Sequence, residues 1–192
     1  MSHELVWYVA YGSNLAADRM LAYLVGGGGD RPWGHHRGAA DPTPPRDDRR
    51  VVVPHPVFFG GHSRRWGGGC CFCPAEPPPD GALPVVGRAW LMTRGQLSDV
   101  VAQENGAETS AVALPDPLPG PGEAVHVLDG WIDLLLCMDP VDGHPSVTLG
   151  STNPPPPGPP SPTYRAVLAT GMAEMGLTPD EAETHLVDLD RR

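Results

Sequence analysis

The sequence predicts an α+β protein built around a mostly antiparallel or mixed β-sheet. The predicted elements run strand, helix, several strands, helix, strands and two helices, an order typical of that class. The 192 residues include 24 glycines and 25 prolines, which cluster between patterned segments. We expect one domain, residues 1–192, with an irregular insertion at about 26–64 and a proline-rich loop at about 151–162.

The first elements are a buried strand and a helix. Residues 5–11, LVWYVAY, are aromatic and β-branched without a turn former, which predicts a strand buried on both faces. Residues 16–24 carry apolar side chains at helical spacing, and the glycine run that follows predicts the end of a helix there.

The next segment alternates irregular and extended stretches. Residues 26–50 contain glycines, prolines and the charged cluster RDDRR, which predicts a loop. Residues 51–59 read as extended chain broken at prolines. Residues 67–75 predict a strand entered through glycines, in which the cysteines serve as small apolar side chains.

A strand and a capped helix follow. Residues 85–92, VVGRAWLM, predict a strand, and residues 93–106 predict a helix. Thr93 and Gln96 have the spacing of a capping box, and Gly106 is a C-terminal stop signal.

The last third of the chain predicts a hairpin and two helices. Residues 123–138 contain an Asp-Gly turn signal at Asp129. The proline-rich loop should run extended over the surface. Ser161 or Thr163 caps the first helix, and Thr178 precedes a proline that begins the second.

The charge argues against nucleic-acid binding. The formal net charge is −10, and a nucleic-acid surface needs a basic stripe. The arginine pairs at 49–50 and 64–65 are interrupted, and we interpret them as solvated loop arginines.

Cysteine use and hydropathy favour a reduced, soluble cytoplasmic protein. Three of the four cysteines lie within residues 70–73, unlike a disulfide framework, and no signal peptide is visible. The longest apolar run is far shorter than the ~20 residues that span a bilayer.

No metal site is expected. His35, His36, His55 and His62 and the cysteine cluster include possible ligands. However, adjacent histidines in a loop do not easily reach one ion, and adjacent cysteines face opposite sides of a strand.

The junction Tyr11-Gly12-Ser13-Asn14 is the first candidate site. A strand that turns into a helix here leaves backbone N–H groups without partners, near the positive end of the helix dipole. A carboxylate or a developing oxyanion fits such a place. The alternative is that Ser13 and Asn14 form an ordinary N-cap.

Glu104 and Tyr164 are two further candidates. Glu104 lies near a helix C-terminus; burial there would disfavour its charged form and suit it to proton transfer, whereas the alternative is a solvated glutamate at a fraying end. Tyr164 falls in the first turn of a helix after a stiff proline segment, and it either covers a neighbouring site or belongs to the core.

Four segments together resemble the γ-glutamylcyclotransferase-like family. They bracket most of the chain and occur in the family order: YVAYGSNL (8–15), WGGG (66–69), GRAWLM…LSDVVAQENG (87–106) and PPSPTYRAVLATGMAEMGL (159–177). The resemblance implies a small barrel-like mixed β-sheet flanked by helices, in agreement with the order of elements above.

The resemblance also implies roles for particular residues. Glu104 is the implied general base, although Asn105 stands where a glycine would more usually follow, and the nearest other glutamate is Glu108. The implied substrate-binding residues are Tyr11, Gly12, Ser13, Asn14, Leu15 and Tyr164.

The implied reaction cleaves a γ-glutamyl amide. Glu104 takes a proton from the substrate α-ammonium, the freed amine attacks its own γ-carbonyl, and 5-oxoproline and a free amine or amino acid are released. No metal or organic cofactor is implied; the partner is a small-molecule γ-glutamyl substrate, and the protein is a monomer or homodimer. Two alternatives remain: a related acyl or amide transferase of a specialised biosynthetic pathway, and a non-catalytic small-molecule-binding module.

Overall fold

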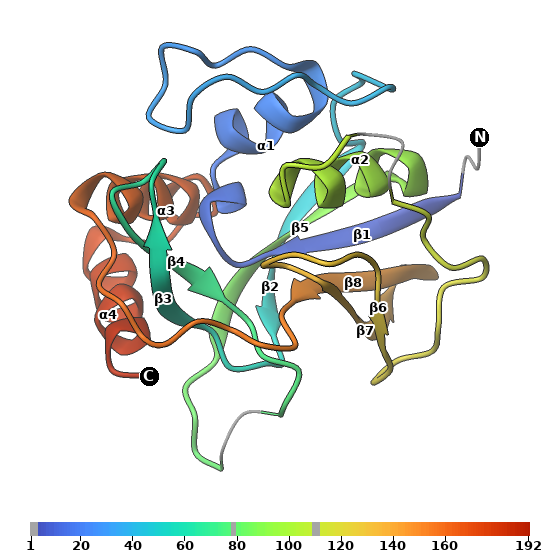
Figure 1. Cartoon of the computed structure of the whole chain (residues 1–192). Coiled ribbons are helices and arrows are strands. Elements are labelled where there is room, and N and C mark those ends of the chain that lie inside the picture. Colours follow the sequence, from blue (N-terminus) through green and yellow to red (C-terminus); the bar gives the residue numbers. More distant parts are fainter. Residues whose placement is uncertain (1–3, 78–79, 109–111) are drawn as a thin grey trace.

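The computed structural model describes residues 4–77, 80–108 and 112–192, and it confirms the α+β class (Figure 1). The strands in this part are β1 (Leu5–Ala10), β2 (Asp47–Val53), β3 (Phe58–Ser63), β4 (Gly68–Phe72), β5 (Val85–Thr93), β6 (Ala124–His126), β7 (Leu134–Val141) and β8 (His144–Gly150). The helices are the short 3-10 helix η1 (Ser13–Leu15), α1 (Ala17–Val25), α2 (Arg94–Glu104), α3 (Pro162–Glu174) and α4 (Pro179–Asp190).

Six strands form a mixed sheet in the order β2-β5-β1-β8-β7-β6. Strand β1 pairs antiparallel with β5 and parallel with β8. Alternate residues of β1 enter two different apolar clusters: Trp7 and Val9 face one, and Val6 and Tyr8 face the other. The first strand is therefore buried on both faces, as predicted. Helices α1 and α2 cover one face, and α3 and α4 lie on the other (Figure 1).

Strand β2 corrects one expectation. The charged residues at its start were expected in a loop, but Asp47 to Val53 pair in register with Leu91 to Val85 of β5. As the edge strand, β2 exposes alternate side chains to solvent, which tolerates this charge. Arg49 lies over the Trp7 ring at 4.4 Å.

The β7–β8 hairpin was not expected from the sequence. Its turn is Asp142-Gly143, whose φ angles of 49° and 77° are typical of a type I′ turn. The predicted hairpin at 123–138 is confirmed by the antiparallel pairing of β6 with β7, although the connection at 127–133 is longer than a two-residue turn.

The proline-rich segment is extended as predicted, and it packs on the small β3–β4 sheet. Isolated bridges join Gly60 to Pro157 and Gly69 to Pro160. A Cβ atom on Gly69 would lie 2.1 Å from the Gly158 carbonyl oxygen, so this close approach requires glycine. Ser161, one of the two predicted caps, then caps α3.

In the described ranges, no helix combines the length and apolar character needed to cross a lipid bilayer.

Candidate active site

The junction between β1 and α1 presents unpaired backbone donors. Within the described part of the chain, the N–H groups of Gly12, Ser13 and Asn14 donate no hydrogen bond, whereas those of Leu15 and Ala16 bond back into η1. The N-cap alternative is wrong, because Gly12 and Ala16 hold the N-cap positions of η1 and α1 and neither makes a side-chain cap bond.

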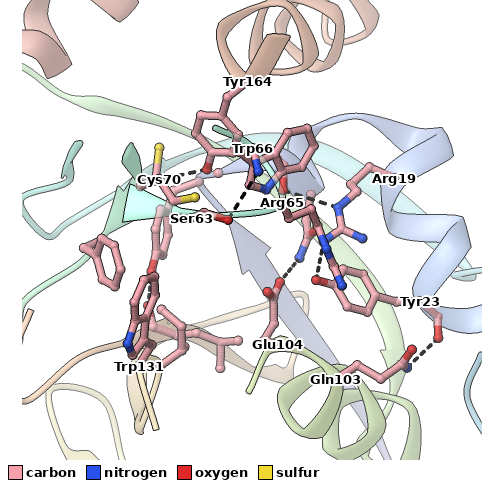
Figure 2. A pocket seen from close by; sticks show the side chains of 18 of the residues that line it. Arg19, Tyr23, Ser63, Arg65, Trp66, Cys70, Gln103, Glu104, Trp131 and Tyr164 are labelled. Carbon is pink, nitrogen blue, oxygen red and sulfur yellow. Dashed lines mark hydrogen bonds between the residues drawn. The ribbon is translucent and has the colours of Figure 1, made fainter. Parts of the chain in front are cut away.

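A cavity of about 240 Å³ lies beside this junction. It is bordered by α1, the C-terminal end of α2, the β3–β4 hairpin, the connection before β7 and the first turn of α3. Figure 2 shows Glu104 below the cavity, Tyr164 and Trp66 above it, Arg19 and Tyr23 on one side and Trp131 on the other. Segments distant in sequence therefore converge here.

Glu104 is the last residue of α2, where the capping box at Thr93 and Gln96 begins the helix as predicted. Its Oε1 accepts a hydrogen bond of 2.7 Å from Asn14 Nδ2, which also donates to the Tyr8 hydroxyl at 3.1 Å. The carboxylate is half-buried, less than the full burial that the sequence argument considered.

The bond to Glu104 also sets the direction of the Asn14 amide. A carboxylate only accepts, so Nδ2 must face it and Oδ1 must point elsewhere. Asn14 Oδ1 is buried and has no hydrogen-bond partner in the described chain. Because this oxygen is closed off from solvent, the Glu104 carboxylate is the acceptor of this pair that a cation in the cavity can reach.

Two tyrosines complete the surroundings of Glu104. Burial and the negative charge of Glu104 raise the pKa of Tyr8 and of Tyr23, so both remain protonated donors. Tyr23 Oη accepts a hydrogen bond of 2.5 Å from Arg19 Nη2, and its own O–H is a donor toward Glu104. Arg19 is thereby linked to the carboxylate through one hydroxyl.

Tyr164 is both a cavity residue and a core residue. Its hydroxyl accepts from the Cys71 backbone N–H at 3.1 Å, and its ring meets that of Trp66 edge-on at 5.0 Å. A Cβ atom on Gly12 would lie 3.0 Å from the same hydroxyl, so the phenol lies directly against the junction. Burial raises the pKa of Tyr164 well above its usual value, and the phenol stays neutral.

The structure brings most of the sequence-predicted residues together. Tyr11, Gly12, Ser13, Asn14, Glu104 and Tyr164 all border the cavity. Leu15 does not: its side chain is fully buried in the core. The other nearby glutamate, Glu108, is exposed and pairs with Arg37.

Sequence reasoning missed several cavity residues. Arg19 is buried on the helix face that also carries Tyr23, four residues later, and a charged residue on an apolar helix face was an available signal. Arg65, interpreted as a solvated loop arginine, borders the cavity from the β3–β4 turn. Trp131, which is 53% exposed, gave no signal.

The cysteines are neutral thiols. Burial raises the pKa of Cys70, which borders the cavity, to about 11, and that of Cys73 to about 12. All four cysteines are free. Across the described ranges, no three or more His, Cys, Asp or Glu side chains are grouped so as to hold a metal ion.

Asn105, the departure from the family pattern, anchors the connection that carries Trp131. Its Nδ2 donates to the carbonyls of Ile132 (2.8 Å) and Val101 (3.0 Å), and its Oδ1 accepts from Ile132 N–H at 3.1 Å. A Cβ atom on Gly130 would lie 2.2 Å from Asn105 Oδ1. Through these hydrogen bonds, Asn105 therefore holds the 127–133 connection against the end of α2.

We expect Asn105→Asp to lower the free energy of unfolding by about 1–3 kcal/mol, because a carboxylate oxygen would face two carbonyls that lose their donor. Urea unfolding of the variant measures this. Asn153→Asp, at an exposed position, is the matched control. An Asn105→Asp protein as stable as the control would contradict the anchoring.

The fold defined by this sheet and its helices is the γ-glutamyl cyclotransferase-like fold, as the sequence motifs predicted. A solved γ-glutamyl cyclotransferase is similar with a TM-score of 0.56 and 21% identity, over 95% of this chain and 86% of that chain. An uncharacterized human protein is similar with a TM-score of 0.54 and 21% identity, over the same 95% and 86%.

YkqA from Bacillus subtilis also has this fold, with a TM-score of 0.51 and 15% identity over 97% of this chain and 54% of that chain. No protein-family model matches the sequence, and no curated protein matches it significantly.

Proposed function

We propose that the protein is a γ-glutamylcyclotransferase-type enzyme that cleaves a γ-glutamyl amide and releases 5-oxoproline and a free amine or amino acid. One observation carries the proposal: a carboxylate and a junction with three unpaired backbone N–H groups border one cavity. This set matches a substrate that presents an ammonium group and a carbonyl that develops negative charge.

In the proposed reaction, Glu104 receives the substrate α-ammonium and accepts one of its protons. The amine nitrogen then forms a bond to the γ-carbon, closing a five-membered ring. The N–H groups of residues 12–14 stabilise the oxyanion, an effect worth about 3 kcal/mol for a single donor in other enzymes. Glu104 returns the proton to the leaving nitrogen as its bond to carbon breaks. It then takes the surplus proton of the ring nitrogen, which the released amine takes up.

The proposal includes no cofactor, because an intramolecular ring closure requires positioning more than an external activating group. A reducing cytoplasmic environment is part of the proposal, since all four cysteines are free.

A substrate panel tests the proposal. The purified protein is incubated with γ-glutamyl amino acids, γ-glutamyl alkylamides and a γ-glutamyl-ε-lysine compound, and 5-oxoproline is measured by chromatography. We expect catalytic release from at least one compound. Binding without any release would indicate a non-catalytic module, and a γ-glutamyl product formed on an added amine would indicate transfer to another acceptor.

A further inference from the structure

The guanidinium of Arg19 is buried at the edge of the cavity without a carboxylate partner. The residue is 2% exposed, and its donors reach the Tyr23 hydroxyl, the Ser13 hydroxyl at 3.4 Å and Nε2 of His36. No carboxylate in the described part of the chain forms an ion pair with it. Arg19 reaches the Glu104 carboxylate only through the Tyr23 hydroxyl, so its buried charge has no direct counter-ion, which is unfavourable.

Unlike Arg19, the other buried arginines of the described chain form ion pairs with carboxylates. Arg88 pairs with Asp48 at 2.7 Å and with Glu174 at 2.5 Å. Arg94 pairs with Glu4 at 3.0 Å and with Asp116 at 2.8 Å. Carboxylates are abundant in a chain of net charge −10, so the unpaired guanidinium at the cavity is specific to that place.

A second guanidinium lies beside the first. Arg65 Nη1 is 3.2 Å from the same His36 Nε2 that Arg19 contacts. Burial and the charges of both arginines lower the pKa of His36 to about 3, so the imidazole is neutral near pH 7. A neutral imidazole nitrogen has one lone pair and cannot satisfy both guanidiniums. Both arginines border the cavity, and Arg65 is exposed, so its remaining donors are accessible there.

We propose that Arg19 and Arg65 form a carboxylate subsite of the cavity, which holds a carboxylate of the bound substrate beside the donors of residues 12–14. This rests on the proposed function for the identity of the substrate. Planar guanidiniums bind carboxylates through paired hydrogen bonds, and here the carboxylate supplies the charge that Arg19 lacks. In a γ-glutamyl amino acid, that group is either the glutamyl α-carboxylate or the carboxylate of the leaving amine.

Three related compounds separate these two sources. The first is γ-glutamylalanine, which has both carboxylates. The second is the same compound with the glutamyl α-carboxylate converted to a carboxamide, so that its cyclic product is 5-oxoprolinamide. The third is γ-glutamylethylamide, in which the leaving amine has lost its carboxylate. Each is assayed with the wild-type protein and with Arg65→Met, whose exposed side chain makes a folding defect unexpected.

The subsite predicts related changes in KM when either the substrate carboxylate or an arginine is removed. In the wild type, removing the carboxylate that occupies the subsite raises KM by about tenfold or more. Arg65→Met raises KM for compounds that keep this carboxylate and has little effect on the compound that lacks it. Arg19→Lys, which keeps the charge but not the paired donors, shows the same pattern, whereas a misfolded variant would lose activity on every compound. Arg31→Met, at an exposed arginine paired with Asp18, is the control for loss of one positive charge.

Calorimetry separates failure of the subsite from failure of the proposed function. The three compounds are titrated into Glu104→Gln protein, which is expected to bind without turnover. If the wild type turns over all three compounds with equal KM, the subsite is wrong and the proposed function stands. If it releases no 5-oxoproline but binding still depends on one carboxylate and on Arg65, the proposed function is wrong and the subsite stands. Binding that depends on neither overturns the subsite.

Discussion

Replacing Glu104 with glutamine is expected to reduce the rate of 5-oxoproline release by about 10²- to 10⁴-fold while leaving substrate binding nearly intact. Glutamine has the same shape, and its amide oxygen can still accept the hydrogen bond that Asn14 Nδ2 donates to Glu104 at 2.7 Å. It cannot accept the proton of the substrate ammonium. We therefore expect kcat to fall while the calorimetric affinity changes little.

Glu108→Gln is the matched control for this experiment. Its side chain is 87% exposed and pairs with Arg37, so the substitution removes a carboxylate four residues away without entering the cavity. This variant is expected to retain wild-type kcat. A Glu104→Gln enzyme with normal turnover, or a Glu108→Gln enzyme as impaired as Glu104→Gln, would show that the base is wrongly assigned.

Gly171→Ala is expected to destabilise the protein, although it lies within a helix. Alanine normally stabilises a helix interior by about 1 kcal/mol relative to glycine. Here the added Cβ would lie 2.4 Å from the Leu15 carbonyl carbon and 2.5 Å from the Ala16 nitrogen. Overpacking of this kind costs about 1–3 kcal/mol and sometimes more, so the clash outweighs the helix preference.

The same clash should reduce activity. Helix α3 lies against η1, and moving them apart displaces the donors at Gly12, Ser13 and Asn14. We expect a lower urea midpoint together with slower 5-oxoproline release for Gly171→Ala.

Gly95→Ala provides the comparison within another helix. Its added Cβ would come no closer than 3.9 Å to Thr93 Oγ1, an ordinary contact, so the variant should be as stable as the wild type or slightly more stable. If Gly171→Ala were equally harmless, the close packing of α3 on η1 would be refuted.

Much of the fold could be predicted because local signals decide it. The apolar run at 5–11, with its valines and aromatic residues, predicted a buried strand without any partner, and the Thr93–Gln96 capping box set the start of α2. Strand β2 could not be predicted from its charged sequence, because its structure depends on pairing with β5. Strand β8 was overlooked, although Asp142-Gly143 carried a turn signal as strong as the one at Asp129.

The residues of the site also fall into those that the sequence could predict and those that it could not. The junction residues and Glu104 were accessible because a strand–helix turn and a helix end are local features. The sequence could not predict that Arg19, Arg65 and Trp131 lie at the same cavity. Each reaches the cavity from a different element, and no spacing in the sequence relates them. The unpartnered Asn14 Oδ1 becomes visible only when the bond to Glu104 orients the amide.

The parallel pairing of β1 with β8 has a consequence for the order of assembly during translation. The Thr148 hydroxyl donates to the Val9 carbonyl oxygen across 139 positions of the chain. Ribosomal synthesis therefore completes the first strand long before its neighbour exists, and contacts between such remote segments form slowly. A growing polypeptide that stops short of position 144 leaves one hydrogen-bonding edge of its earliest strand unpaired. That edge is a binding site for chaperones that shield extended apolar segments.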